Sequence, residues 1–430
     1  MQALHPATSA TQSARAPSRR FLWFALILLV ISICINYIDR GNLSVAGPDV
    51  AREFGANPER MGLLFSAFFA PYALFQIFAG WLIQRYNVNW LYALGFLIWS
   101  GATALTGLAN GFAMLFALRL VLGLAESVAY PCYSKIIANG FPEQQRGVAN
   151  SLIDWGSKMG QALGVVLCGV LLANYGWRNM FLLIGGISMV WLIPWVWVSM
   201  YQKTDSAGSG VVIKPPTILE IVSKRSAWGT FIGLFCYNYM AYFLITWLPS
   251  YLRTERHYTK EMISTLGSLP FFAIGFSSLL SGSLSDYLIR RGASPTRVRK
   301  GFLVTGLTMS TLVLAASLVT DQKISMGILV AGCVSMGIAS SNIWALTQRL
   351  SGRGAAAQWT GLQNGFGNLA GVIAPWLTGW TVHTTGSFFY AFVVAAGIVI
   401  LGAMAYLWIV GDAEEIHWSS NPLPLQADKF

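Results

Sequence analysis

The 430-residue chain is 55% hydrophobic and only 10% charged, and it has a formal net charge of +11 at pH 7. Soluble domains carry roughly 25% charged residues, so this composition excludes a soluble protein and indicates one that spans a lipid bilayer. The positive charge does not indicate nucleic-acid binding, because no basic domain lies outside the apolar segments. Lysine and arginine accumulate on the cytoplasmic side of membrane proteins, and this bias explains the surplus.

The chain begins with a polar segment, 1–20, which we expect to be a disordered cytoplasmic tail. About twenty apolar residues are needed to cross a bilayer, and this rule predicts an all-α membrane protein with twelve transmembrane helices. The predicted spans are Phe21–Val45, Met61–Gln84, Trp90–Leu108, Gly111–Ala138, Val148–Ala173, Trp177–Met200, Trp228–Leu252, Met262–Leu288, Gly301–Val319, Ser325–Leu350, Trp359–Val382 and Phe388–Val410.

A polar stretch, 201–227, divides these spans into two six-helix bundles, 21–200 and 228–410, and a second cytoplasmic tail is expected at 411–430. With the N-terminus inside, 18 of the 28 lysines and arginines fall on the cytoplasmic side and 7 on the other. This asymmetry predicts that both termini are cytoplasmic. Weak similarity between the two halves indicates a parallel repeat, with a site between them near the midplane.

Two charged residues lie deep inside each of the first and fourth predicted spans. Arg119 and Glu126 are seven residues apart, about two helical turns, so they project from one face of their helix. Asp39 and Arg40 are adjacent in the first span. Such groups cost roughly 2.5–3.5 kcal/mol at bilayer depth on insertion scales, so they face the protein interior and usually mark a path for substrate or protons. A buried structural ion pair is the alternative.

Helix geometry places these groups at different depths. Counted from the outer ends of their spans, Asp39 and Arg40 lie roughly 8–9 Å deep and Arg119 about 12 Å deep, while Glu126 lies near the middle. Asp39 and Arg119 can therefore meet, and an inert pair of these two is the structural alternative. Adjacent helical residues point about 100° apart, so one of Asp39 and Arg40 can bridge to the fourth span while the other faces a cavity.

The fifth span carries Asp154 and Lys158, an acid–base pair at i,i+4 in the favourable order. Lys158 lies about eleven residues inside the span, level with Glu126 and too deep to reach water comfortably. The pair is either self-neutralising or supplies a second cation to the cavity. A dicarboxylate substrate would favour the second interpretation.

Two motifs carry a family resemblance. Residues 36–43 (NYIDRGNL) and the pattern R-x-x-x-G-x-x-E-x-x-x-Y-P at 119–131 resemble the anion:cation symporter family of the major facilitator superfamily. The resemblance covers Phe21 to about Glu415 and implies a transporter of organic anions such as sugar acids. It implies that Arg40 binds the substrate carboxylate, that Asp39 and Glu126 carry protons, and that further residues line the cavity, namely Tyr37, Tyr72, Arg119 and Asn364.

A second signature closes the second span of the later half. Gly282, Asp286, Arg290 and Arg291 fit the G-x-x-x-D-x-x-x-R-R-G pattern of the superfamily, which implies a cytoplasmic gate at this position. In the fifth span, Ser157 stands where galactonate-type members carry glutamine. This difference argues against galactonate itself as the substrate.

Together these observations predict a secondary active transporter, not an enzyme, that imports a small organic anion with protons by alternating access. A hexonate, hexuronate or glucarate is the substrate we expect first. An importer of an aromatic or short aliphatic carboxylate, or an organic-anion exchanger or exporter, is the alternative. The sequence contains no P-loop motif for ATP, so we expect the proton gradient to drive transport without cofactor or metal. We expect a monomer in the bacterial inner membrane.

Overall fold

The computed structural model of the chain describes residues 19–141, 143–201 and 216–418. Most of the expected tail at 1–20 lies outside these residues, as do much of the central stretch 201–227 and the end of the tail at 411–430. Every regular element in the described part of the chain is helical. The prediction of an all-α membrane protein is therefore confirmed.

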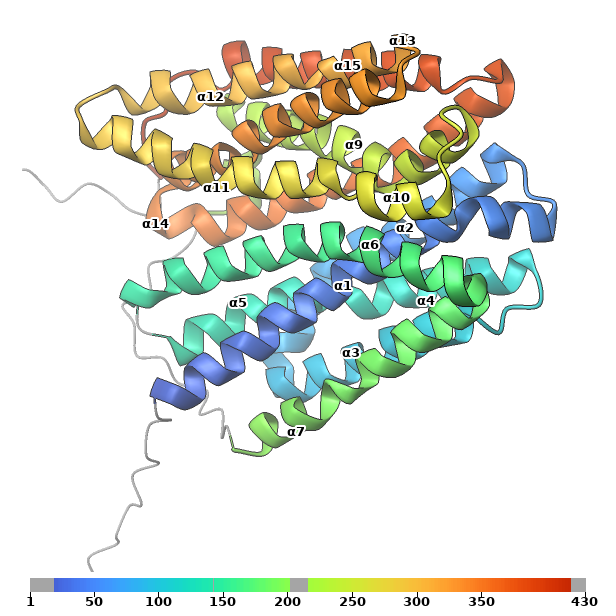
Figure 1. Ribbon diagram of the computed structural model, residues 1–430. Coiled ribbons are helices and arrows are strands. Elements are labelled where there is room, and N and C mark those ends of the chain that lie inside the picture. Colours follow the sequence, from blue (N-terminus) through green and yellow to red (C-terminus); the bar gives the residue numbers. More distant parts are fainter. Residues whose placement is uncertain (1–18, 142, 202–215, 419–430) are drawn as a thin grey trace, which may run out of the picture.

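The helices form two bundles that lie side by side, the first coloured blue to green and the second yellow-green to red in Figure 1. The first bundle contains α1 (Arg19–Phe54), α2 (Pro58–Arg85), α3 (Val88–Thr106), α4 (Phe112–Glu126), α5 (Ala129–Gly140), α6 (Glu143–Val190) and α7 (Leu192–Tyr201). The second contains α8 (Ile218–Val222), α9 (Arg225–Thr254), α10 (Lys260–Leu266), α11 (Leu269–Arg290), α12 (Pro295–Ser310), α13 (Leu312–Leu318), α14 (Gln322–Thr385), α15 (Phe388–Met404) and the π-helical turn η1 (Ala405–Ile409).

These elements make the twelve predicted spans. The two longest helices, α6 and α14, each contain two spans and turn at a glycine with positive φ, Gly176 (76°) and Gly352 (62°), a conformation that glycine adopts without strain. Other spans consist of two pieces, such as α4 with α5 and α10 with α11. Nine stretches of the described residues are long and apolar enough to cross a membrane, and one of them, Ala149–Tyr201, holds two spans. The remaining two spans are α2 and the second part of α14.

The bundle has two distinguishable sides. The start of α1 and the end of η1 lie on one, which we call the terminal side, and the turn between α1 and α2 lies on the opposite side (Figure 1). On the opposite side, a Cβ atom at Gly62 would lie 2.5 Å from the carbonyl oxygen of Pro375, and one at Gly379 would lie 2.4 Å from that of Pro58. Only glycine permits such close helix packing. The two halves are therefore closed against each other on the opposite side.

Helix α1 is longer than predicted and contributes to this closure. It runs nine residues past the predicted end of the first span, and the added turns carry Asp49. The Asp49 carboxylate pairs with Arg253 of α9 at 2.9 Å and with Lys260 of α10 at 3.0 Å. An ionic bridge thus joins the two halves on the opposite side.

Candidate substrate and coupling site

An ion pair joins α1 and α4 inside the first bundle. Arg40 Nε donates a hydrogen bond to Glu126 Oε2 at 3.1 Å, and both residues are buried. Arg40 Nη2 and Glu126 Oε1 have no hydrogen-bond partner among the described residues. A buried charge with unfilled hydrogen-bonding capacity is costly. The pair therefore retains an unpaired guanidinium nitrogen and an unpaired carboxylate oxygen.

The position of this pair differs from the predicted depths. Because α1 continues to Phe54, Arg40 lies fourteen residues before the end of the helix, about 21 Å along its axis. Glu126 lies equally far from the start of α4, so the two residues are level, whereas counting from the predicted end of the first span had placed Arg40 nearer the outer side. The residue that bridges to the fourth span is therefore Arg40.

Three aromatic rings surround the Arg40 guanidinium. Its Cζ atom lies 4.8 Å from the ring centre of Tyr37, 5.1 Å from that of Phe68 and 4.4 Å from that of Tyr72. Cation–π contacts of this kind stabilise a desolvated guanidinium while its N–H groups stay available for hydrogen bonds. Tyr37 and Tyr72, which the resemblance implied as cavity residues, thus lie against Arg40. Phe68 was not predicted.

Asp39 and Arg119 are joined through a third residue, Asn42. Asn42 Nδ2 donates to Asp39 Oδ1 at 3.2 Å, and Arg119 Nη2 donates to Asn42 Oδ1 at 2.9 Å. Arg119 Nη1 also reaches the backbone oxygen of Asp39 at 3.4 Å. Asp39 and Arg119 are therefore close together, as expected, but their described side chains form no direct ion pair. Sequence analysis missed Asn42, although it lies three residues after Asp39 on the same helix face.

Helix α4 ends directly after Glu126, inside what we had predicted as one continuous span. The chain turns before α5 begins, and Pro131 cannot donate the backbone hydrogen bond that would continue the helix across this point. A helix C-terminus carries partial negative charge, so the Glu126 carboxylate depends on Arg40 for compensation. Arg119 and Glu126 both lie on the buried face of α4, which confirms the interpretation of their seven-residue spacing.

The second bundle contributes polar groups from α9 and α14. The Tyr242 hydroxyl donates to Asn368 Oδ1 at 2.6 Å, and Asn368 Nδ2 donates to the backbone oxygen of Asn364 at 2.9 Å. The Tyr242 ring lies 4.4 Å from that of Phe69 on α2, and Tyr242 interacts electrostatically with Arg40. Asn364 was expected here, whereas Tyr242 and Asn368 were not. Asn368 could have been found, since it lies one helical turn after Asn364.

Lys158 and Asp154 on α6 form the expected intrahelical pair, with Nζ and Oδ2 2.6 Å apart. The Lys158 side chain is 10% exposed and that of Asp154 is 52% exposed. The cation is thus enclosed while its counter-ion lies at an open edge. The contact is compatible with both interpretations given for this pair.

The signature at the end of α11 contains an ion pair with the next helix. Asp286 forms an ion pair with Arg299 of α12, which also donates to Ser285 Oγ at 2.7 Å. Arg290 and Arg291 are exposed, and Arg291 lies over the Tyr287 ring. Gly282 faces Ser341, which a Cβ atom there would approach to 3.3 Å. Arg299 was not predicted because it lies on the following helix, seven residues beyond the motif.

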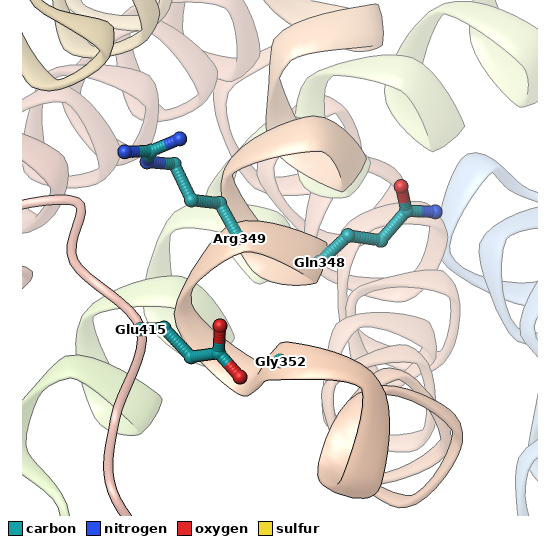
Figure 2. A pocket seen from close by; sticks show the side chains of 4 residues that line it. All are labelled: Gln348, Arg349, Gly352 and Glu415. Atoms are coloured by element: carbon teal, nitrogen blue, oxygen red, sulfur yellow. The ribbon is translucent and has the colours of Figure 1, made fainter. Parts of the chain in front are cut away.

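A separate cavity of about 420 Å³ lies at the turn of α14 on the terminal side, lined by Gln348, Arg349, Gly352 and Glu415 (Figure 2). Arg349 Nε donates to the backbone oxygen of Ala413 at 2.6 Å, so the C-terminal segment is fastened to α14 here. The residues around Arg40 do not line this cavity, and it is not part of the candidate site.

Comparison with known proteins places this geometry in a family. The model of the Major Facilitator Superfamily matches residues 29–375. The chain is 29% identical over 445 residues to the probable galactarate/D-glucarate transporter of Escherichia coli K12, with 95% of this chain and 98% of that one covered. It is 29% identical over 429 residues to the D-galactonate transporter of Escherichia coli O6:H1, with 94% and 98% covered.

Among solved structures, the fold is similar to that of a bacterial homologue of the human lysosomal transporter Spinster, in an inward-facing and occupied conformation. The TM-score is 0.78 at 17% sequence identity, and 91% of this chain and 97% of that one are covered. The family model spans most of the chain. The two relatives are transporters, and this chain matches nearly their whole length. The chain therefore belongs to the Major Facilitator Superfamily and is a multi-pass integral membrane transporter.

Proposed function

We propose that the protein imports a sugar acid together with protons, and that Arg40 binds the substrate carboxylate. The observation that carries this proposal is the buried Arg40–Glu126 pair, which keeps a free guanidinium nitrogen and a free carboxylate oxygen. A guanidinium suits a carboxylate because its planar fork donates two parallel charge-assisted bonds and stays protonated. The named substrates of the relatives, galactarate, D-glucarate and D-galactonate, support the choice of a sugar acid.

Substrate binding is coupled to protons because the substrate carboxylate and Glu126 compete for the Arg40 guanidinium. A substrate carboxylate that binds Arg40 takes hydrogen bonds that Glu126 otherwise uses, and an uncompensated carboxylate in an apolar interior is better accommodated as the neutral acid. Substrate and proton are then bound together and released together. Asp39, held by Asn42 beside Arg119, is the second proton carrier in this proposal.

The remaining groups fix the sugar chain and the orientation of transport. Tyr37, Tyr72 and Asn364 supply hydrogen-bonding groups for the substrate hydroxyls. We assign the terminal side to the cytoplasm of a bacterial inner membrane, since it carries most of the lysine and arginine. A transporter closed on the opposite side is then in the state that exchanges substrate with the cytoplasm. One protomer contains the complete site, so the protein can act as a monomer.

The test uses purified protein in liposomes, with uptake of galactarate and D-galactonate measured under an inward proton gradient. Arg40→Lys keeps the charge but loses the fork, so we expect substrate affinity to fall by at least about tenfold, and Arg40→Ala to fall further. Arg297→Ala, which removes an exposed arginine on the terminal side, serves as the matched control. Unchanged affinity in both Arg40 variants would contradict the assignment of Arg40 to the substrate carboxylate.

A further inference from the structure

Lys158 lies where the two halves of the transporter meet. It belongs to α6 of the first bundle, but its Cβ atom lies against α11 of the second, where a Cβ atom added to Gly275 would lie 3.5 Å from it. The amino group also interacts electrostatically with Tyr237 on α9 and with Tyr37 on α1. Lys158 therefore lies at the junction between the halves, the region where transporters built from two repeats hold their substrates.

Tyr37 connects this lysine to the proposed carboxylate anchor. Its ring lies 4.8 Å from the Arg40 guanidinium, and the same residue is an electrostatic neighbour of Lys158. Arg40 within the first bundle and Lys158 at its boundary with the second thus share Tyr37 as an electrostatic partner.

The Lys158–Asp154 contact is asymmetric, in a way that a purely structural pair does not require. The ammonium is enclosed and the carboxylate is half exposed, so the Asp154 side chain can turn away from Lys158 with little loss of burial. An ammonium group has three donors, and the hydrogen bond to Asp154 uses one of them. A second anion that replaced Asp154 would meet a desolvated cation with donors to spare.

From this arrangement, and relying on the function proposed above, we infer that Lys158 is a second anion-binding residue of the central site and that the substrate carries two anionic groups. Asp154 acts as the exchangeable counter-ion that neutralises Lys158 when the substrate is absent. The first anionic group of the substrate binds Arg40 and the second binds Lys158. The substrate class is therefore a dianion, such as an aldaric acid, in preference to a monocarboxylic sugar acid.

Charge balance in the site agrees with this class. Three cations, Arg40, Arg119 and Lys158, face three carboxylates, Asp39, Glu126 and Asp154, and net charge in a buried site is costly. A dianion adds two negative charges, and protonation of Asp39 and Glu126 removes two. A dianion therefore enters with two protons without leaving net charge inside the membrane.

The test compares two sugar acids that differ at one end only. Galactarate and D-galactonate share their carbon skeleton, but galactarate ends in a second carboxylate where galactonate ends in a hydroxymethyl group. Binding of each acid to the purified protein is measured by calorimetry, and the ratio of the two dissociation constants is the readout. We expect the wild type to prefer galactarate and Lys158→Gln to reduce this preference by at least about tenfold. Lys158→Arg should retain most of it.

Two further variants complete the design. Asp154→Asn removes the competing carboxylate and should strengthen galactarate binding more than galactonate binding, which provides a readout even if Lys158→Gln does not fold. Lys323→Gln, at an exposed lysine on the opposite side, should leave the ratio unchanged. Equal losses for both acids in Lys158→Gln, relieved by adding Asp154→Asn, would assign the pair a structural role and overturn the inference.

The outcomes separate this inference from the proposed function. A wild type that binds galactonate through Arg40 but shows no preference for galactarate overturns the dianion inference and leaves sugar-acid transport standing. A wild type that binds neither acid overturns both. If Asp154→Asn leaves the ratio of the two dissociation constants unchanged, Asp154 is not an exchangeable counter-ion, which also contradicts the inference.

Discussion

Arg40 on α1 and Glu126 on α4 form an ion pair in which Nε and Oε2 lie 3.1 Å apart while the two side chains are only 2% and 0% exposed. The Arg40 guanidinium stays charged, so it can pair either with Glu126 or with the carboxylate of an incoming substrate. When the substrate takes the cation, Glu126 is left in an apolar setting that disfavours its ionised form. One contact thus links the binding of an anion to the binding of a proton.

Glu126→Gln should separate binding from coupling. The amide imitates the protonated carboxyl group, so the variant should still bind substrate and exchange internal for external substrate. It should lose accumulation against a gradient, because the empty carrier can no longer release a proton before it resets. Counterflow and pH-driven uptake in proteoliposomes measure the two activities, with Glu261→Gln, at an exposed glutamate on α10, as the control. Accumulation with undiminished proton flux would make Glu126 structural and leave Asp39 as the coupling carboxylate.

Asp49→Asn should weaken the closure of the opposite side. The Asp49 carboxylate bridges α1 to Arg253 and Lys260 in the other half, and losing two partly exposed ion pairs costs about 1–2 kcal/mol in total. The population closed on the opposite side should fall relative to the open one by roughly 5- to 30-fold. Spin-label distances between α1 and α9 on that side measure this shift.

A nearby acidic residue provides a matched control for Asp49. Glu53 lies one helical turn further along α1, but it pairs with Arg178 and Trp177 of its own half. Glu53→Gln should therefore leave the distance distribution between the halves unchanged. An equal shift in both variants would indicate a local effect on α1 instead of a bridge between the halves.

Two adjacent glycines on α6 should respond in opposite directions to the same substitution. A Cβ atom at Gly185 would lie 2.4 Å from the backbone nitrogen of Ala104 on α3, whereas one at Gly186 has no atom within 4 Å. Gly185→Ala should destabilise the protein by about 1–3 kcal/mol through overpacking. Gly186→Ala should be neutral or slightly stabilising, because alanine favours the helix. Thermal melting in detergent compares them, and similar melting temperatures would contradict the packing of α3 against α6.

The sequence predicted the helices well because hydrophobic length is a direct requirement of the bilayer. Apolar runs marked all twelve spans, and the seven-residue spacing of Arg119 and Glu126 placed both on one face of α4, as the structure confirms. Both inferences depend only on local periodicity. Neither needs knowledge of how the helices pack.

The partners within the site could not be predicted in the same way. Depths were counted from the apparent ends of apolar runs, but α1 remains helical through Asp49 and beyond, which moved Arg40 level with Glu126. Asn42, which links Asp39 to Arg119, and Tyr242, which enters from the second half, acquire their roles only from tertiary contacts. Sequence spacing does not contain that information.

Proton uptake on substrate binding is the direct measure of the link between anion binding at Arg40 and proton binding at Glu126. Calorimetric titration of galactarate or D-galactonate into the purified protein, repeated in buffers with different heats of ionisation, gives the number of protons taken up per substrate. We expect proton uptake by the wild type and about one proton fewer in Glu126→Gln, since linkage requires that the two equilibria change together. Equal proton uptake by wild type and Glu126→Gln, with substrate bound by both, would contradict it.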